Sequence, residues 1–587
     1  MSASSDLEAL CKAGALGRLD VWFASALSRL GGSSDRLVEL GAALASRAVT
    51  VGDVCVDLRA CAGRPVDTAE LDDPKHVQGM RWPELDAWRA ALQGSPAVGV
   101  RREGCPLVLD DDRLYLARMW LHERRVAEAL RDRAKATVRV EGMDVEAQLD
   151  ALFASVTEAD SRQRDAVRQT LTRPLVVITG GPGTGKTTIV ARIVALLAAW
   201  ANQKVGRLPL IALLAPTGKA AVRLREAVES ELGKLPLQQS FRGALVRAIE
   251  AMTIHRALGQ GRGGERAVQH HRDDPLPSEV VIVDEASMVD LVLMSRLLDA
   301  LRPGARLVLL GDEHQLASVE AGSVLGDICA ASDALDGCVV RLARSWRYPA
   351  EGAIGRLADA IRAGDVDRVL EVLERPGSDE VVLRAPVGSS LPDELVGELQ
   401  AQYRDLSSGD VPRRLAALQR FRVLCAHRRG PASVALVNES FVERLRSQGR
   451  ARHETLFDGR PVLVTRNEHD LDLYNGDIGV LAPGENDELV AWFPTASGPR
   501  AIPPQMLPPH ETVFAMSVHK AQGSEADAVA VLLPMEPSPI VTRELLYTAV
   551  TRARRRVVVY ASRDVVAAAV RRRVARSSGL RERLTAA

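Results

Sequence analysis

The sequence has few aromatic residues, no excess of either charge and no long apolar run. Phe, Trp and Tyr account for 4% of its 587 residues, so a surface that stacks many nucleic-acid bases is not expected. Lys and Arg together number 76, as do Asp and Glu, so the chain as a whole carries no basic field. Any binding of a polyanion would therefore depend on local grooves, whose charge the totals do not reveal.

Metal-binding cysteine motifs, export signals and membrane spans are also missing from the sequence. The seven cysteines are scattered and none forms a Cys-x-x-Cys pair, so a zinc or iron–sulfur site is not expected. A dispersed and odd cysteine count fits the reducing cytoplasm. The first residues lack a basic stretch followed by an apolar core, and the most apolar stretch, 189–201, is interrupted by Arg192. We therefore expect a cytoplasmic protein with no membrane contact.

The length and the hydrophobic patterns predict several domains. A chain of 587 residues is too long for a single core and predicts three or four domains. Apolar residues recur at helical spacing in residues 1–110, which predicts a helical N-terminal domain. A helical pattern that begins near Arg113 leads from this region into the rest of the chain.

Beyond residue 160, short β-rich runs alternate with helical stretches. One set of runs comprises 175–179, 210–214, 280–283 and 307–310, and a second set comprises 422–426, 433–437, 528–533 and 556–561. This alternation is typical of parallel sheets covered by helices, so we predict an α/β fold with two α/β domains, 111–335 and 336–587. Short runs between Gly- and Pro-containing turns predict a small β insertion at about 455–510.

The strongest motif is a glycine-rich loop between a predicted strand and a predicted helix. It reads Gly180-Gly181-Pro182-Gly183-Thr184-Gly185-Lys186-Thr187, which matches G-x-x-x-x-G-K-[ST]. Glycines let the backbone N–H groups point at phosphate oxygens, Lys186 supplies a charge to the β- and γ-phosphates, and Thr187 offers a hydroxyl to Mg²⁺. The alternative is a structural turn, which the strand–loop–helix context disfavours. The motif therefore predicts ATP and Mg²⁺ as ligands.

Two later strands end in polar residues that suit the same chemistry. The run 280–283 leads into Asp284, which would hold Mg²⁺, and Glu285, which would orient and deprotonate the attacking water. The run 307–310 leads into a Gly-Asp-Glu-His-Gln stretch, from which Gln315 could touch the γ-phosphate. Ligands of α/β proteins bind at the carboxyl ends of the strands, where both runs deliver these groups.

Together these three motifs resemble motifs I, II and III of superfamily 1 helicases. The residues after the third motif, 317–324, resemble the RecD family in particular. Stretches 345–347, 517–525 and 547–553 resemble motifs IV, V and VI, so the resemblance covers about residues 160–560. It implies two RecA-like P-loop NTPase domains that close on ATP, the second with a β-barrel-like insertion.

The resemblance assigns roles to individual residues. Arg347 and Arg552 would reach the γ-phosphate from the second domain, while Gln163 would read adenine and Trp346 could stack on it. The implied catalytic residues are Lys186, Asp284, Glu285, Gln315, Arg347 and Arg552. The implied nucleotide-binding residues are Gln163, Gly181, Pro182, Gly183, Thr184, Gly185, Lys186, Thr187, Thr188, Trp346 and Glu525, and the implied Mg²⁺ ligands are Thr187 and Asp284.

The resemblance also implies a track for DNA. Its candidate residues are Pro216, Thr217, Lys219, His255, Ser517 and His519. Hydroxyls, backbone N–H groups and cations suit phosphate and sugar contacts, so we expect binding that is independent of base sequence and sensitive to salt. A purely structural role for the two histidines remains open. So does the role of the Arg-rich segment 541–587, which is either a solvated face or a DNA or partner contact.

Partners follow from the N-terminal part of the resemblance. Stretches 16–24, 106–109 and 113–116 resemble the amino-terminal region of the RecD family, which docks on RecC. The implied protein is the 5′→3′ DNA helicase of a RecBCD-type complex, in which RecB and RecC homologues help it to process double-strand breaks for recombination. Its substrates would be single-stranded and duplex-end DNA, and no nuclease site is evident in this chain. A standalone RecD-like helicase and an ATP-dependent DNA-binding switch without unwinding activity are the alternatives.

Overall fold

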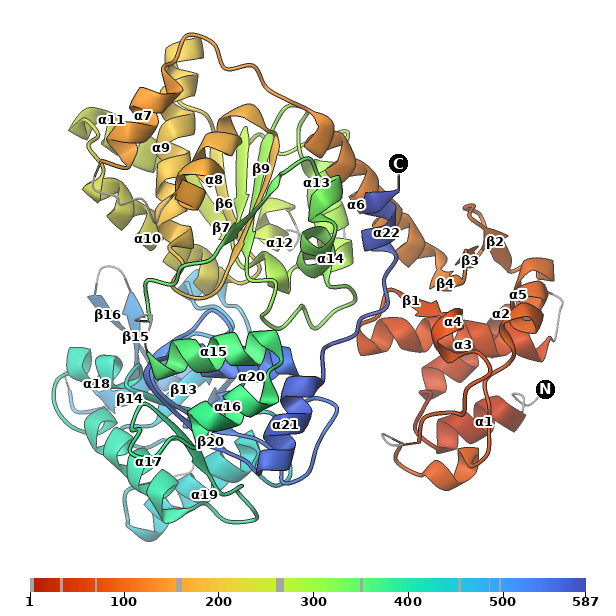
Figure 1. Ribbon diagram of the computed structural model, residues 1–587. Helices are drawn as coiled ribbons and strands as arrows, with labels where there is room; N and C mark the ends of the chain where they lie inside the picture. The colour runs from red at the N-terminus through yellow and green to blue at the C-terminus, as the bar shows by residue number, and fades with distance from the viewer. Residues whose placement is uncertain are drawn as a thin grey trace.

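The strands of the described residues form four sheets, and helices pack on the two parallel ones (Figure 1). The computed structural model describes residues 5–31, 35–68, 71–154, 161–259, 269–348, 352–451, 456–484, 486–495 and 498–586. Residues 455, 485, 496 and 497 of the predicted β insertion therefore lie outside the described residues. Within the described ranges, no helix combines the length and the apolar character that a membrane span requires. The predicted fold class, α/β with parallel sheets and a helical N-terminal region, is confirmed.

The N-terminal unit is helical but also contains a small sheet. Its helices are α1 (Ser5–Lys12), α2 (Arg18–Gly31), α3 (Arg36–Val51), α4 (Leu58–Cys61) and α5 (Leu85–Gly94). Its strands, in the order β1-β4-β3-β2, are β1 (Cys55–Asp57), β2 (Val98–Val100), β3 (Leu107–Asp110) and β4 (Arg113–Leu116). The prediction of a helix from Arg113 was therefore wrong in its first turn, because α6 begins only at Ala117 and ends at Lys135. Strands of three or four residues are too short to show a period of two in the sequence.

The first α/β unit is built around a six-stranded parallel sheet with the order β10-β5-β9-β8-β6-β7. Its strands are β5 (Leu175–Gly180), β6 (Ile211–Ala215), β7 (Ile249–Thr253), β8 (Val280–Val283), β9 (Arg306–Gly311) and β10 (Val339–Leu342). The helices used below are α7 (Val145–Leu152), α8 (Ser161–Thr172), α9 (Lys186–Val205), α10 (Gly218–Lys234), α12 (Ile254–Ala257), α13 (Leu291–Ala300) and α14 (Val324–Ala330). Alternate residues of β5 enter different cores, Val177 with α6 and α13, and Val176 with α8 and α9. The sheet is thus covered on both faces, and β10 belongs to it although it follows the predicted boundary at 335.

The second α/β unit has a five-stranded parallel sheet with the order β11-β20-β19-β12-β18. Its strands are β11 (Val381–Arg384), β12 (Phe421–Cys425), β18 (Ala515–Ser517), β19 (Ala526–Leu532) and β20 (Ala553–Tyr560). Its helices are α15 (Ala353–Ala363), α16 (Val366–Leu373), α17 (Asp393–Leu406), α18 (Val411–Ala417), α19 (Val434–Ser447), α20 (Arg543–Val550) and α21 (Arg563–Arg571). The predicted strand 433–437 is wrong, because it forms the start of α19. The Ser433 hydroxyl accepts a hydrogen bond from Leu436 N at 3.2 Å and caps that helix.

The β insertion lies in the chain between α19 and β18 and forms a separate antiparallel sheet. Its strands, in the order β16-β15-β14-β13-β17, are β13 (Pro461–Val464), β14 (Ile478–Pro483), β15 (Leu489–Thr495), β16 (Gly498–Ile502) and β17 (His510–Thr512). Val464, Leu481 and Phe493 belong to its own small core. Among the described residues the edge strands β16 and β17 each pair with one neighbour, so the sheet is open. The barrel shape remains a prediction.

The last helix, α22 (Leu580–Thr585), leaves the second α/β unit and packs on the first. The chain crosses from α21 to reach α6 and α14, as the blue end of the ribbon in Figure 1 shows. Leu580 and Leu584 are buried in the core of the first unit, although the predicted second domain extended to residue 587. Glu123 of α6 is fully buried and accepts hydrogen bonds from Gly579 N at 2.9 Å and Arg583 Nε at 2.8 Å.

Glu123→Ala should loosen the attachment of the C-terminal segment. The substitution leaves Arg583 without its buried carboxylate, and breaking a buried ion pair in this way costs about 3 kcal/mol. We expect a lower thermal unfolding midpoint and faster proteolytic removal of α22. Glu128→Ala, on the exposed face of the same helix, is the matched control and should change neither. Equal behaviour of the two variants would contradict the prediction.

Candidate nucleotide site and DNA-contacting surface

The glycine-rich loop joins β5 to α9 and is covered by the second α/β unit. Gly183 and Gly185 have φ angles of 76° and 83°, in the left-handed region that favours glycine. A Cβ atom on Gly183 would lie 2.3 Å from Arg347 Cβ, so the close approach of the two units also requires glycine. Trp346 N donates to Gly183 O at 2.7 Å, and the Ser345 hydroxyl donates to Pro182 O at 2.9 Å.

The polar residues of the loop lie together at the start of α9. Lys186 Nζ donates to Gly180 O at 2.6 Å and to Gly181 O at 3.0 Å, and the Thr184 hydroxyl donates to Gly181 O at 2.9 Å. Gln163 of α8 is brought to the same loop, where its Nε2 donates to Thr184 O at 3.0 Å. Thr187 and Thr188 lie half-buried in the first turn of the helix. A helix N-terminus of this kind attracts an anion such as phosphate.

The carboxylates of Asp284 and Glu285 follow β8, and the charge of Lys186 affects the pKa of Asp284. Burial and the charge of Glu285 raise the pKa of Asp284 to about 6, while the Lys186 charge lowers it. Glu285 has a φ of 53°, an uncommon backbone conformation that often marks functional sites. The Ser287 hydroxyl is buried without a hydrogen-bond partner among the described residues. These oxygen groups, together with Thr187, fit a hard cation such as Mg²⁺.

The segment after β9 connects the first unit to helix α20 of the second. Gln315 Nε2 donates to Asp312 Oδ2 at 3.0 Å, and the Tyr547 hydroxyl donates to the same oxygen at 3.1 Å. Leu316 N donates to the Thr548 hydroxyl at 3.0 Å. Burial and the neighbouring Asp312 charge raise the pKa of Tyr547 well above its usual value. Asp312 and Tyr547 were not assigned roles from the sequence, although both lie within the recognised motifs.

A cavity of about 550 Å³ lies where the two units meet. Its walls include Gly181, Pro182 and Thr184 from the first unit, and Tyr547 and Thr551 from the second. The connection between β10 and α15 adds Ser345, Trp346 and Arg347. The ring of Trp346 is 49% exposed and stacks under the Arg344 guanidinium, 4.0 Å from the ring centroid. The structure thus places the phosphate loop and Arg347 around one space, large enough for a nucleotide.

The two predicted arginines have protein partners. Arg347 pairs with Glu525, and the buried Arg552 donates from Nε to Thr548 O at 3.1 Å. Glu525 was predicted to bind nucleotide, but the structure places it between Arg347 and Arg554, whose Nε lies 3.1 Å from its carboxylate. Burial raises the pKa of Glu525, but the charges of both arginines outweigh it, so the pKa is lowered overall. Glu525 therefore stays ionised and orients Arg347 in this arrangement.

The DNA candidates of the first unit lie at the start of α10 and in α12. Pro216 precedes Thr217, which caps α10 by accepting a hydrogen bond from Ala220 N at 3.3 Å, and His255 is exposed in α12. Lys219 is directed to the β insertion instead of to solvent, and its Nζ donates to Gly476 O at 2.8 Å. The ring of Tyr474 covers the adjacent Gly218, where a Cβ atom would lie 2.3 Å from Tyr474 Cδ1. The β insertion therefore packs on the N-terminus of α10.

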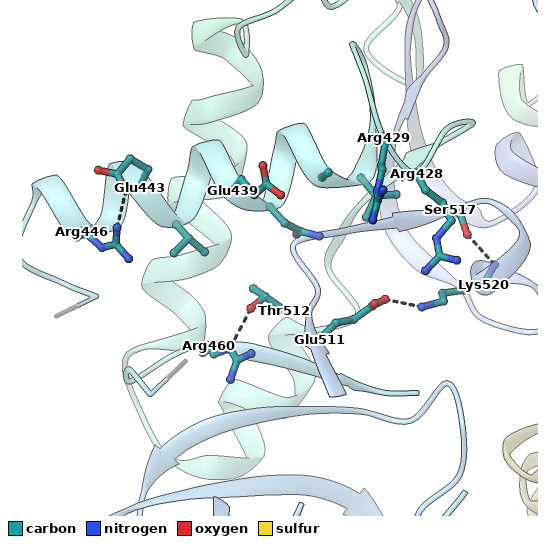
Figure 2. Close-up of a pocket in the computed structure, with 14 residues that line it drawn as sticks. Arg428, Arg429, Glu439, Glu443, Arg446, Arg460, Glu511, Thr512, Ser517 and Lys520 are labelled. Atoms are coloured by element: carbon teal, nitrogen blue, oxygen red, sulfur yellow. Dashed lines mark hydrogen bonds and ion pairs between the residues drawn. The ribbon is translucent and has the colours of Figure 1, made fainter. Parts of the chain in front are cut away.

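The DNA candidates of the second unit lie beside a basic hollow of about 850 Å³ between α19 and the β insertion (Figure 2). Ser517 lines it and accepts a hydrogen bond from Lys520 N at 3.4 Å, while Lys520 Nζ lies 2.5 Å from Glu511. His519 is half-buried, and burial and the Arg576 charge lower its pKa. Arg428 and Arg429 are exposed at the hollow near the start of α19. Sequence reasoning missed these two, although adjacent arginines after β12 were a usable signal.

Stability should depend on pH through Lys219. Burial and the charges of Arg223 and Arg422 lower the pKa of Lys219 to about 7. The unfolded chain therefore binds one more proton than the folded protein between about pH 7 and 10, and stability rises with pH in this window by about 1.4 kcal/mol per unit at most. Lys219→Met should abolish this rise, which thermal unfolding midpoints from pH 6 to 9 would reveal. Parallel curves for the wild type and the variant would refute the assignment.

Family models match three stretches of the chain that contain these sites. The AAA domain model matches residues 163–321, which include the phosphate loop and both strands with acidic ends. The model of the RecBCD enzyme subunit RecD, N-terminal domain, matches residues 12–115. The UvrD-like helicase C-terminal domain model matches residues 512–560, which include Ser517 and Arg552.

Curated relatives cover nearly the whole chain. The RecBCD enzyme subunit RecD of Mycolicibacterium smegmatis is 43% identical over 96% of this chain and 97% of its own length. The same subunit of Haemophilus influenzae is 31% identical over 93% of this chain and 92% of its own length. The ATP-dependent RecD2 DNA helicase of Deinococcus radiodurans is 32% identical over 70% of this chain, but over only 50% of its own length. The chain therefore belongs to the RecD family.

Proposed function

We propose that this chain is the ATP-driven 5′→3′ DNA helicase subunit of a RecBCD-type helicase–nuclease. The observation that carries the proposal is the cavity whose walls combine the phosphate loop of one α/β unit, Arg347 of the connecting segment and Tyr547 of the other unit. Family membership adds the identity of the complex, because the relatives that match the chain almost end to end are named as RecD subunits of RecBCD. The substrate is single-stranded and duplex-end DNA.

The residues of the phosphate loop, of the segments after β8 and β9, and of the second unit divide the work of ATP hydrolysis. Lys186 and the loop N–H groups would hold the β- and γ-phosphates, and Thr187 and Asp284 would hold Mg²⁺, which neutralises phosphate charge when bound. Glu285 accepts the proton of the attacking water, and Gln315 contacts the γ-phosphate. Arg347 and Arg552 stabilise the charge that develops on the transferring phosphoryl group. Gln163 and Trp346 are proposed to contact adenine.

Hydrolysis is coupled to movement because the catalytic groups belong to two units. Arg347 can serve the phosphate only while the second unit lies against the loop that contains Gly183. The contacts of Tyr547 and Thr548 with the Asp312–Leu316 segment are made across the same boundary. Opening and closing of this boundary would displace Ser517 relative to Thr217, which moves DNA held by both units.

The DNA track is proposed to run through the basic hollow of the second unit. Ser517 and Lys520 line it, and the exposed Arg428 and Arg429 line it on the same side (Figure 2). Hydroxyl and cationic groups in this arrangement suit a phosphate backbone and carry no base preference. Glu439 and Glu443 of α19 also line the hollow. Their negative charges would repel the DNA backbone and keep it near Arg428 and Arg429.

The N-terminal unit is proposed to dock on a RecC homologue. Leu19 and Trp22 of α2 lie one turn apart and are 71% and 72% exposed. Large apolar side chains in such a pair are typical anchors of protein interfaces. The position of this helix within the region that matches the RecD N-terminal model supports the assignment.

Unwinding assays on 5′-tailed and 3′-tailed duplexes test the proposal, with the chain alone and with RecB and RecC homologues. We expect unwinding from the 5′ tail only, enhanced by the partners. Lys186→Gln should keep the thermal midpoint but lower ATPase activity by at least about 100-fold, because the phosphate charge loses its cation. Strong activity alone without partner binding would favour a standalone helicase, and ATPase without unwinding would favour a DNA-binding switch.

Removal of the exposed Arg428 and Arg429 side chains should weaken DNA binding equally for all base sequences. We expect the Arg428→Ala, Arg429→Ala double variant to lower the slope of log affinity against log salt by about one for each phosphate that the protein no longer neutralises. Fluorescence anisotropy with homopolymer and mixed-sequence oligonucleotides at several salt concentrations measures this slope. Arg404→Ala, Arg413→Ala removes the same charge from α17 and α18, and should leave it unchanged. Similar slopes for both double variants would remove the hollow from the track.

A further inference from the structure

The Arg-rich end of the chain is folded inward onto the protein. After α21 the chain crosses to the first unit (Figure 1). Within residues 572–586, Arg576 and Arg583 contact protein atoms. Arg583 anchors α22 to Glu123 and Asp110. We call residues 572–586 the C-terminal strap. Arg576 and Arg583 of the strap are bonded to protein groups, whereas other arginines of the strap, such as Arg581, are exposed to solvent.

Arg576 binds three backbone carbonyl groups of a single loop. Its Nη1 donates to Glu320 O at 2.5 Å and Gly322 O at 3.1 Å, and its Nη2 donates to Ser318 O at 2.5 Å. This loop runs from β9 to α14 and begins with the Asp312–Leu316 segment of the nucleotide site. One guanidinium therefore fixes the second half of the loop whose first half carries Gln315.

The same point is connected to the N-terminal unit. Gly322 N donates to Gly52 O at 3.0 Å, at the C-terminal cap of α3. Val54 N donates to Ser577 O at 2.8 Å, and Ser577 N donates to Asp53 Oδ1 at 2.7 Å. The loop, the strap and the N-terminal unit thus meet around Arg576. The Arg576 charge also contributes to the lowered pKa of His519 in the second α/β unit.

We propose that Arg576 is a positioning residue for Gln315, and that it acts by holding the loop between β9 and α14. This inference rests on the proposed ATPase function. A planar guanidinium can donate to several carbonyls at fixed angles, which a lysine ammonium on a flexible stem does not reproduce. Loss of the clamp removes this donor from Ser318 O and leaves Glu320 O and Gly322 O with the Ser318 hydroxyl, at 2.9 and 3.3 Å, as a donor. The loop is then held less firmly, and Gln315 can drift from the γ-phosphate. Because Gln315 contributes to the reaction more than to nucleotide binding, the kcat should fall while the KM for ATP is nearly kept.

The test is DNA-stimulated ATPase activity of the full chain and of Arg576→Ala and Arg576→Lys. We expect kcat to fall on the order of tenfold in the alanine variant, as for a catalytic group displaced by part of an ångström, with a change in KM for ATP below about twofold. Arg576→Lys should restore only part of the lost kcat. It also serves as the informative variant if Arg576→Ala does not fold.

Two controls separate positioning from charge and from stability. Arg581→Ala removes an exposed arginine from the same strap, and Leu149→Ala removes a fully buried side chain of α7, away from the loop. Both should keep the wild-type kcat, although Leu149→Ala lowers the thermal midpoint.

Two results would overturn the proposal. The first is an unchanged kcat in Arg576→Ala, and a lower salt slope of DNA binding in that variant would then make Arg576 a phosphate contact. The second is a kcat loss in Leu149→Ala as large as that in Arg576→Ala at a similar loss of thermal midpoint, because kcat would then follow stability. A wild-type chain without ATPase activity would instead contradict the proposed function itself.

Discussion

The close approach of the second α/β unit to the phosphate loop is the contact on which the nucleotide site depends. At Gly183 even a methyl group would overlap Arg347, and the backbone of Trp346 is hydrogen-bonded to the same glycine. Neither unit encloses the cavity alone, because the loop follows β5 of the first unit, whereas Arg347 lies in the connection between β10 and α15 and pairs with Glu525 of the second unit. A site divided in this way responds to every movement between the units, which is the physical basis of a motor.

Two further connections cross the boundaries of the units and restrict that movement. The β insertion, which belongs to the second unit in sequence, packs on α10 of the first through Lys219 and Tyr474. The C-terminal strap leaves the second unit and is held on the first by Glu123. Both connections reach elements next to the proposed ATP and DNA sites, so they can link the N-terminal unit and the insertion to the nucleotide cycle.

The charge totals of the chain do not show where its cations lie. Many cations are used inside the protein, where backbone carbonyl groups or carboxylates satisfy them. Arg306 donates to Thr170 O and Leu171 O at 2.7 and 2.8 Å, and Arg576 and Arg583 hold the strap. Cations that could meet a polyanion line the hollow of the second unit, where Arg428, Arg429 and Lys520 lie together with three glutamates. Local concentration of charge suits a protein that grips a phosphate backbone and must also bind partner subunits.

The sequence alone determined the parts of this protein whose information is local. Two motifs each lie within a few consecutive residues. They are the phosphate loop between β5 and Lys186, and the acidic residues after β8. Their spacing was enough to predict the strands and a site for ATP. Short-range patterns failed where strands have only three or four residues, as in β1 to β4, and where Ser433 caps a helix that resembled a strand. Tertiary structure decided which distant groups meet. It paired Arg347 with Glu525 and directed Lys219 to the carbonyl group of Gly476. It also brought Arg576 to the loop between β9 and α14, which contains Gln315. Such contacts depend on how separately folded surfaces fit together, and no periodicity within one segment records that fit.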